Sequence, residues 1–332
     1  MMRFNAILFN IVEQCNIRCR HCGYADSKRA AVSEEDELID WAIQAVEYGI
    51  PHIIFTGGEP FMQFPLLKRS VEAVHKHGGN SGVFTNSLWG KTLESARETI
   101  KQLPGLTHLY LSTDIYHLEF VPIENILNVI SAARELSIPR VIICITHTSE
   151  EDKEMITSYF TKDLDYINFH YGKVIPSPQV QNLVPDAYDC MHEFIPNNFS
   201  HHCFLHTPLV NANGTLSTCH IGKVETHLDI KSSPYYLGNL KEEKLKDIFD
   251  RSEQNAVYQF LRTYGPKGLV NTLLTSPMEK ELKDQCFSCD CHMCFMVFLK
   301  KDTINIVENQ AQQKHVQNNI FLKRILTLGD TI

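Results

Sequence analysis

The sequence predicts an α/β fold built on a mostly parallel sheet. Short apolar runs alternate regularly with longer amphipathic stretches over the first half of the 332-residue chain. Each amphipathic stretch is long enough to carry the chain back to the start of a neighbouring parallel strand. The composition, with 43% hydrophobic and 21% charged residues, is typical of a globular protein with a sizeable core.

Six strands and five helices are expected in alternation. The first helix shows the reasoning: Ser33 is a favourable cap, acidic residues follow in the first turn, and apolar residues recur at helical spacing up to Tyr48. The other helices are expected at residues 65–77, 92–103, 123–136 and 150–160, and the strands at 6–12, 52–56, 82–86, 106–112, 140–146 and 166–171.

Three cysteines follow the first expected strand. Cys15, Cys19 and Cys22 are spaced Cys-x3-Cys-x2-Cys, so one loop can bring three thiols to one metal centre. A four-iron cluster normally takes four thiolates, and three would leave one iron open. A structural zinc knuckle is the alternative, although zinc sites usually pair cysteines in C-x2-C spacing and His21 is badly placed as a fourth ligand.

Together with a second motif, this loop resembles the radical S-adenosylmethionine (SAM) superfamily. The second motif is Gly57-Gly58-Glu59-Pro60, which follows the second expected strand and resembles the segment that holds the methionine amine of SAM. The resemblance implies a partial (β/α)6 TIM-like barrel over residues 1–175, with chemistry at the carboxyl ends of its strands. It also implies a SAM-binding [4Fe-4S] cluster on Cys15, Cys19 and Cys22.

Polar residues near the strand ends are further candidates for binding SAM. The resemblance implies that His21 lies near the adenine, and that Asn86, Ser112 and Asp114 contact the ribose or carboxylate of SAM, or the substrate. The alternative for Asn86 and Ser112 is that they only cap the following helices, a role that these residue types favour. For His117, a hydrogen-bonded loop histidine is the alternative to a place over the barrel mouth.

Beyond the sixth strand the alternation stops. Prolines interrupt residues 176–202, which are expected to form an irregular bridge between domains. Residues 203–300 are expected to form a small second domain, which opens with two short strands joined by an Asn/Gly turn and continues with a helix over residues 241–250. Residues 301–332 are expected to form a tail with a short amphipathic helix, at residues 320–326, that docks on the barrel.

The second domain resembles the SPASM or twitch auxiliary-cluster domains of one branch of radical SAM enzymes. The spacing Cys203-x10-Gly-x4-Cys219 carries this resemblance, but no cysteine follows Cys294, which departs from a full SPASM pattern. The resemblance implies at least one auxiliary [4Fe-4S] cluster, and one or two clusters both stay open. A structural zinc on the last four cysteines is the alternative. The candidate ligands are Cys203, Cys219, Cys286, Cys289, Cys291 and Cys294.

The resemblance implies reductive cleavage of SAM to a 5′-deoxyadenosyl radical, which takes a hydrogen atom from a substrate C–H. An external donor such as flavodoxin or ferredoxin would supply the electron. Candidate catalytic residues are His220 and Asp114, and the thiols Cys190 and Cys144 could return a hydrogen atom. Histidine titrates in the range that suits a base.

A ribosomally made peptide is the expected substrate, altered by cross-linking, oxidation or epimerisation. Oxidation of a small metabolite such as an aminocyclitol or sugar is the first alternative, and is favoured by the lack of a spare N-terminal stretch for a leader-binding module. A non-catalytic iron–sulfur electron carrier is the second, and the intact Gly57-Gly58-Glu59-Pro60 segment argues against it.

Composition limits location and partners. No apolar run reaches the roughly 18 residues that a membrane span needs, and no signal peptide precedes the first strand. Eleven cysteines in such a chain indicate metal ligands or reactive thiols in a reducing cytoplasm rather than disulfides. The net charge of −8 makes nucleic acid an unexpected partner.

Overall fold

The six expected strands lie side by side in one parallel sheet. We describe a computed structural model of the chain over residues 1–22, 31–176, 184, 192–201, 203, 207–219 and 233–331. The strands pair in sequence order, so their carboxyl ends meet at one edge of the sheet. They are β1 (Ala6–Val12), β2 (His52–Gly57), β3 (Asn80–Thr85), β4 (Leu106–Ser112), β5 (Arg140–His147) and β6 (Ile167–Lys173).

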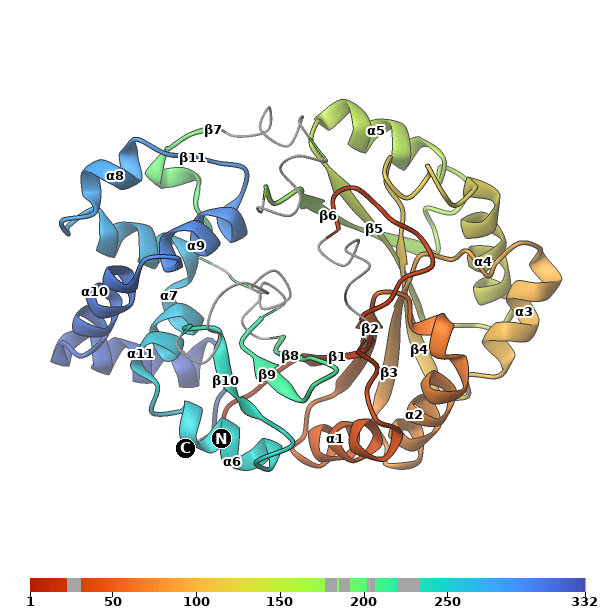
Figure 1. The fold of residues 1–332 in the computed structure, drawn as a ribbon, viewed down its shortest axis with the longest axis horizontal. Coiled ribbons are helices and arrows are strands. Elements are labelled where there is room, and N and C mark those ends of the chain that lie inside the picture. The colour runs from red at the N-terminus through yellow and green to blue at the C-terminus, as the bar shows by residue number, and fades with distance from the viewer. Residues whose placement is uncertain are drawn as a thin grey trace.

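Five helices alternate with these strands and cover the convex face of the curved sheet (Figure 1). Apolar side chains of both layers, among them Phe9 from the sheet and Leu67 and Ile126 from the helices, are fully buried between them. Every strand and helix of this half lies within two residues of the range that the sequence predicted, which confirms the partial-barrel fold class. The helices are α1 (Glu35–Glu47), α2 (Phe64–Lys76), α3 (Leu93–Lys101), α4 (Ile123–Glu135) and α5 (Glu150–Ser158).

The start of α1 differs from the prediction in one respect. Glu34, and not Ser33, is the N-cap residue of this helix. The Ser33 hydroxyl instead donates a hydrogen bond to the Asn10 carbonyl at 2.9 Å, and its backbone N–H donates to Ile11 at 2.8 Å. Ser33 therefore fixes the segment before α1 against β1 rather than capping the helix.

Three short strands from the second half continue the same sheet beyond β1. β8 (Leu209–Val210) pairs with β1 in parallel, and β9 (Thr215–Ser217) and β10 (Tyr236–Asn239) follow in antiparallel order. The two short strands expected after Cys203 are thus present. They extend the barrel sheet instead of forming a separate one, so the sheet runs across the expected domain boundary at residue 203.

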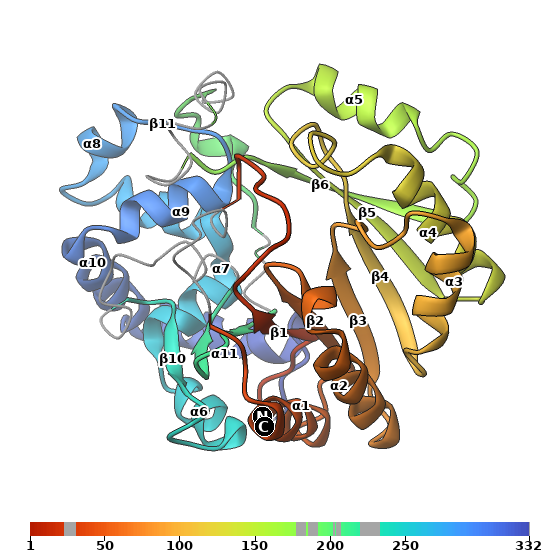
Figure 2. The same ribbon diagram turned by 45° about the vertical axis from the view of Figure 1, so that its right-hand side comes forward.

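Most of the C-terminal helices lie on the other side of the molecule from α2–α5 (Figure 2), whereas the first of them packs against α1. The helix expected at 241–250 begins at Leu245 instead. The expected tail helix begins earlier, at Lys314, and packs on α7 rather than on the barrel helices. They are α6 (Leu245–Ser252), α7 (Ala256–Leu273), α8 (Glu279–Lys283), α9 (Asp290–Phe298), α10 (Lys301–Ala311) and α11 (Lys314–Leu326).

Short elements complete the described chain. β7 (His192–Glu193), from the expected bridge, pairs with β11 (Cys286–Phe287), and two single-turn 3-10 helices are η1 (Pro60–Gln63) and η3 (Pro196–Asn198). Among the described residues, none of the helices combines the length and the apolar character that a membrane span requires.

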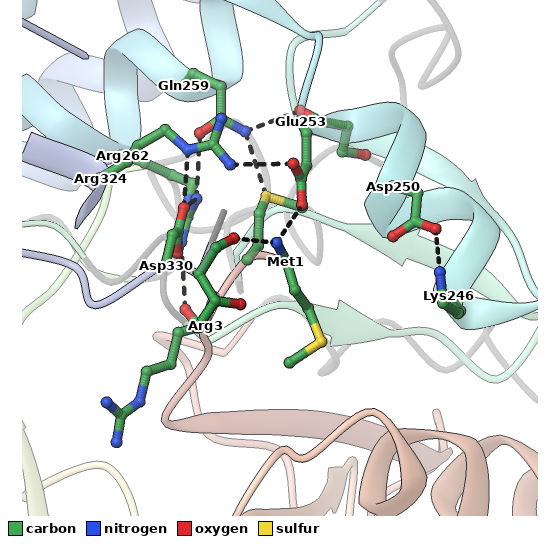
Figure 3. A network of polar contacts seen from close by, with 12 residues as sticks. Met1, Arg3, Lys246, Asp250, Glu253, Gln259, Arg262, Arg324 and Asp330 are labelled. Atoms are coloured by element: carbon green, nitrogen blue, oxygen red, sulfur yellow. Dashed lines mark hydrogen bonds and ion pairs between the residues drawn. The ribbon is translucent and has the colours of Figure 1, made fainter. Parts of the chain in front are cut away.

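A buried ion pair fixes the segments that flank the fold to α7 (Figure 3). Asp330 accepts hydrogen bonds from Arg262 at 3.0 and 3.1 Å, and both side chains are almost fully buried. Asp330 also accepts from the backbone N–H of Arg3 and from the Arg324 guanidinium, each at 2.8 Å. The segment after α11 and the segment leading into β1 are therefore held at one point on α7.

Candidate active site

The cysteine loop, residues 15–22, leaves the carboxyl end of β1. The Cys19 side chain is 3% exposed and packs with Ile17 and Tyr116, and Cys15 and Cys22 lie against the same small apolar cluster. The backbone N–H of Cys22 donates to the Cys19 carbonyl at 3.0 Å, which closes a turn. The structure thus brings together the three cysteines that the sequence predicted to converge.

The surroundings of these cysteines disfavour the negatively charged thiolate form in the absence of a bound cation. Burial raises the pKa of Cys15 to about 11, and the charges of Glu59 and Cys22 add to the rise. Burial likewise raises the pKa of Cys19, and the charges of Asp114, Cys22 and Cys15 raise it further. A positive centre among the three would reverse this penalty, as bound metals do for coordinating thiols.

The spacing of the thiols bears on which metal centre they fit. Within the described part of the chain, no three thiols are close enough together to hold a single ion. A zinc ion would draw its thiolates to about 2.3 Å from one point, whereas a four-iron cluster takes one thiolate at each of its irons and spreads them further apart. The cysteine loop therefore fits a cluster better than a zinc knuckle.

Gly57 and Gly58 let the turn after β2 lie directly against the strand that leads into the cysteine loop. The Gly58 N–H donates to the Val12 carbonyl at 2.6 Å, and the next N–H along the chain donates to Gln14 at 2.9 Å. A Cβ on Gly58 would lie 1.9 Å from the Gln14 carbonyl oxygen. A Cβ on Gly57, whose φ is +148°, would lie 2.2 Å from the Val12 oxygen. Only glycine permits this backbone approach.

Glu59 is buried below this turn and connects it to the end of β3. Its Oε1 accepts from the Thr85 hydroxyl at 2.9 Å and from the Phe61 N–H at 3.1 Å, and its Oε2 accepts from the Asn86 N–H at 2.7 Å. Burial raises the pKa of Glu59 to about 7, although these hydrogen bonds oppose the rise. Pro60 begins η1 and ends the motif.

Asn86 reaches from the end of β3 to the cysteine loop. Its Nδ2 donates to Asn16 Oδ1 at 2.7 Å and lies 3.7 Å from Cys15 Sγ. The helix that follows, α3, is capped by Thr92 in a capping box with Ser95. Asn86 therefore does not cap α3, and that alternative for Asn86 is wrong.

Ser112 ends β4, where it lies opposite Cys144 of β5 in the sheet register. The next helix, α4, has Pro122 as its N-cap residue. Ser112 is thus too far along the chain from α4 to cap it, and the capping alternative fails here as well. Its contact with SAM stays a prediction.

Asp114, His21 and His117 meet beside the cysteine loop. Asp114 Oδ1 accepts from the backbone N–H groups of Tyr116 and His117 at 3.1 and 3.0 Å. Asp114 Oδ2 lies 3.9 Å from His21 Nε2, and Oδ1 lies 2.9 Å from His117 Nδ1. The sequence pointed to these residues one by one, and the structure places them together.

Burial acts in opposite ways on the pKa values of Asp114 and His21. It would raise the pKa of Asp114, but His117, His21 and hydrogen bonds outweigh it, so the pKa lies below its ordinary value. Burial lowers the pKa of His21 to about 4, against the charge of Asp114. The cluster therefore holds a carboxylate beside a neutral imidazole at neutral pH.

A second set of thiols gathers between β9 and α9. Cys219 follows β9, Cys289 is the N-cap residue of α9, and Cys291 and Cys294 lie three residues apart on its first turns. A hydrogen bond to Cys289 and burial raise the pKa of Cys291, with the charges of Cys203 and Cys219 adding to the rise. Burial also raises the pKa of Cys294, with the charges of the same two residues as further causes.

Three of the remaining predicted residues are one exposed cysteine and two residues that the structure does not describe. Cys286 is exposed on β11, where it lies opposite Glu193 of β7. Cys190 and His220 lie outside the residues that the structure describes. Their predicted roles, as a hydrogen-atom donor and as a base, stay predictions.

Sequence reasoning missed two residues of these sites. Asn16 lies inside the Cys-x3-Cys spacing, and this position is a signal that the sequence contains. Its hydrogen bond with Asn86 joins segments 70 residues apart, so the sequence does not indicate that contact. Tyr235 is buried with its hydroxyl 3.3 Å from Cys294 Sγ. Its position between Cys219 and the helix expected at residues 241–250 was the only local clue.

Comparisons with known proteins place the first half in a family. Residues 9–160 match the Radical SAM superfamily. YydG of Bacillus subtilis (strain 168), whose name assigns it to peptide biosynthesis, is 27% identical over 151 residues, which are 44% of this chain and 47% of YydG. GTP 3′,8-cyclase of Listeria welshimeri is 25% identical over 185 residues, which are 51% of this chain and 54% of the cyclase. The chain spans about half the length of these curated relatives.

A solved structure extends the likeness in fold to most of the chain. The structure of anSMEcpe with bound AdoMet and Cp18Cys peptide covers 92% of this chain and 99% of its own, with a TM-score of 0.54. Its sequence identity of 13% means that this likeness shows the fold alone. With the family match, the motif geometry and the parallel sheet in agreement, residues 9–160 are a domain of the radical SAM superfamily.

Proposed function

We propose that this protein is a radical SAM enzyme that modifies a peptide. The observation that carries the proposal is the linkage around the cysteine loop. Within the radical SAM domain, Gly58 bonds to the strand that enters the loop, and Asn86 bonds to Asn16 inside it. When bound, a SAM-ligated [4Fe-4S] cluster supplies reductive cleavage of SAM and thereby a carbon radical that can take a hydrogen atom.

The chain's own residues would hold and orient that group. Cys15, Cys19 and Cys22 are the ligands that the loop offers to three irons. Glu59 is buried and uses three acceptor positions internally, which leaves capacity on Oε2 for the ammonium of SAM. Asn86 and Ser112 end neighbouring strands at the same edge and would face the rest of SAM.

A single auxiliary [4Fe-4S] cluster fits the second set of thiols. Cys203, Cys219 and Cys294 would be ligands, with the fourth from Cys289 or Cys291. The exposed Cys286 would not take part. Apolar and aromatic surroundings, including the buried Tyr235, would exclude water from this centre.

A peptide is the substrate class that the comparisons favour. The name of YydG refers to peptide biosynthesis, and the anSMEcpe structure was solved with a bound peptide, Cp18Cys. A small metabolite is the second candidate, because the Listeria relative is named for a reaction of GTP. An external one-electron donor of the flavodoxin or ferredoxin type completes the proposal.

The test is an anaerobic incubation of the reconstituted enzyme with SAM, a reductant and either of two substrate sets. One set holds short precursor peptides encoded beside the gene, and the other holds nucleotides and cyclitols. We expect the amount of 5′-deoxyadenosine to rise in proportion to the amount of modified peptide. The modified peptide has lost two hydrogen atoms or has gained deuterium from D2O. Turnover with a small metabolite and none with peptides would overturn the peptide assignment.

A further inference from the structure

We propose that His21, Asp114 and His117 form a binding site for one divalent metal ion that uses none of the cysteine thiols. One ligand atom from each residue lies within 4.8 Å of the others. This is the sole group of three or more metal-ligating side chains with that geometry in the described part of the chain. Two imidazole nitrogens and a carboxylate oxygen are a donor set that Zn²⁺ and Fe²⁺ take in proteins.

Unsatisfied polar atoms inside the cluster point to a missing partner. Asp114 Oδ2, His21 Nδ1 and His117 Nδ1 are all buried and make no hydrogen bond. The Asp114 side chain is 1% exposed and each histidine side chain 13%. A buried carboxylate oxygen without a partner is unfavourable, and such atoms are rare in folded proteins. One ion at the centre of the cluster would give Asp114 Oδ2 a partner, with His21 Nε2, the ring nitrogen nearer to that oxygen, as a ligand from the cysteine loop.

The contact between His117 and Asp114 does not provide the missing hydrogen bonds of these buried atoms. His117 Nδ1 lies 2.9 Å from Asp114 Oδ1, yet the pair lacks the alignment of a hydrogen bond. Oδ1 is already occupied by the two backbone N–H groups of Tyr116 and His117. These bonds fix the carboxylate so that Oδ2 stays available, as hydrogen bonds around a metal-binding carboxylate usually do.

Two segments of the chain bring the three ligands together and are held against each other. His21 belongs to the cysteine loop, while Asp114 and His117 belong to the turn after β4. Arg20 bonds to Glu119 at 3.0 Å across the same two segments, and the His21 and Tyr116 rings lie 4.8 Å apart. An ion here would fasten the cysteine loop to that turn.

The site would also be able to take an outside ligand. Three protein ligands leave at least one coordination position open, as in catalytic zinc sites. The chemical class that fits it is an oxygen donor, a water molecule or a carboxylate of a bound molecule. This inference does not rest on the proposed function, because it uses none of the cysteine thiols.

The experiment titrates Co²⁺ alone into the iron-reconstituted full-length protein, with its cysteine sites filled. The wild type is compared with Asp114→Asn and His117→Gln, and with His77→Gln as the control, since His77 is exposed near the end of α2. We expect one added Co²⁺ per wild-type and control chain, with the absorption of nitrogen and oxygen ligands and without a thiolate charge-transfer band. Asp114→Asn and His117→Gln should each bind Co²⁺ at least about tenfold more weakly than the wild type.

A second measurement does not depend on the folding of the variants. In wild-type protein with ¹⁵N-labelled histidine, hyperfine spectroscopy of bound Co²⁺ should show two histidine nitrogens. Absence of added Co²⁺, a thiolate band, or equal binding by all variants would overturn the site. If Asp114→Asn weakens SAM binding while wild type binds no Co²⁺, the unsatisfied atoms serve SAM instead, and the inference fails.

SAM cleavage measured on the same samples separates this inference from the proposed function. Protein that cleaves SAM but binds no Co²⁺ overturns the metal site alone. Protein that binds Co²⁺ at these residues but never cleaves SAM overturns the proposed function alone.

Discussion

The side-chain amide of Asn86 donates a hydrogen bond to the side-chain oxygen of Asn16 across 2.7 Å. The contact joins the end of β3 to the loop that carries the three cysteines. Glu59, which accepts from the Asn86 backbone at 2.7 Å, adds the turn after β2 to the same unit. The ends of β2 and β3 and the cysteine loop are therefore held together by the side chains of Asn16, Glu59 and Asn86.

Replacement of Asn86 by alanine should loosen the cysteine loop. The variant loses the bond to Asn16 and the bond that its Oδ1 accepts from Leu88 at 3.0 Å. We expect a loss of about 1–3 kcal/mol in the free energy of unfolding and slower SAM cleavage. Urea unfolding and a 5′-deoxyadenosine assay measure the two effects. Asn80→Ala, at the exposed start of β3, is the control, and equal behaviour of the two variants would contradict the account.

Gly58→Ala should displace the cysteine loop without removing any functional group. The new methyl would overlap the Gln14 carbonyl oxygen, which is backbone and cannot rotate away. We expect a loss of at least about 2 kcal/mol in stability and reduced iron bound at the first site. Gly172→Ala is the matched control, because its Cβ would meet nothing within 4 Å. Full iron content in Gly58→Ala would show that the close approach is not needed.

The buried Glu59 predicts a pH dependence of stability. Its pKa is raised by burial from 4.5 to about 7 in the folded protein, so between these values the folded state holds more protons than the unfolded state. This contribution of Glu59 to stability is present below about pH 4.5 and is lost as the pH rises through about 7, with a size on the order of 3 kcal/mol.

Glu59→Gln should remove this loss because glutamine does not titrate. Unfolding free energies of the metal-free protein, measured at several pH values between about 4.5 and 8, should fall less with rising pH in the variant than in the wild type. Parallel curves for the two proteins would mean that Glu59 has an ordinary pKa.

Asp330→Asn should destabilise the protein by about 3–5 kcal/mol, because it leaves the Arg262 guanidinium buried without its counter-charge. Thermal or urea unfolding measures the loss. Adding Arg262→Met should recover part of it, since the unpaired charge is then gone. Asp284→Asn, at an exposed position after α8, is the control. A loss below about 1 kcal/mol, the usual value for an exposed pair, would contradict the buried character of this contact.

Local signals predicted the barrel half well. The continuous apolar run Ala6–Val12 and the helical spacing of apolar residues around α2 are both patterns of neighbouring residues in the sequence. The Gly57–Pro60 motif could likewise be identified from the sequence. Its glycines are needed because the backbone of another segment passes too close for a Cβ.

Contacts between distant segments could not be predicted in the same way. The meeting of His21 with Asp114 depends on where β4 ends relative to β1, which no local pattern states. The tail helix was predicted to dock on the barrel and packs on α7 instead, because an amphipathic pattern gives a buried face but not its partner. Residue type alone predicts Ser33 as a cap, whereas in the structure its hydroxyl donates to the Asn10 carbonyl and Glu34 takes the cap position.

The central claim is that Cys15, Cys19 and Cys22 hold the cluster that cleaves SAM. The most direct measurement is iron and sulfide per chain, with SAM cleavage assayed on the same anaerobic samples, for wild type and a Cys15/Cys19/Cys22→Ala variant. The account predicts about eight irons and active cleavage in the wild type, and about four irons and no cleavage in the variant, on four-iron stoichiometry. A variant that still cleaves SAM, or a reduced, fully loaded wild type that does not, would contradict it.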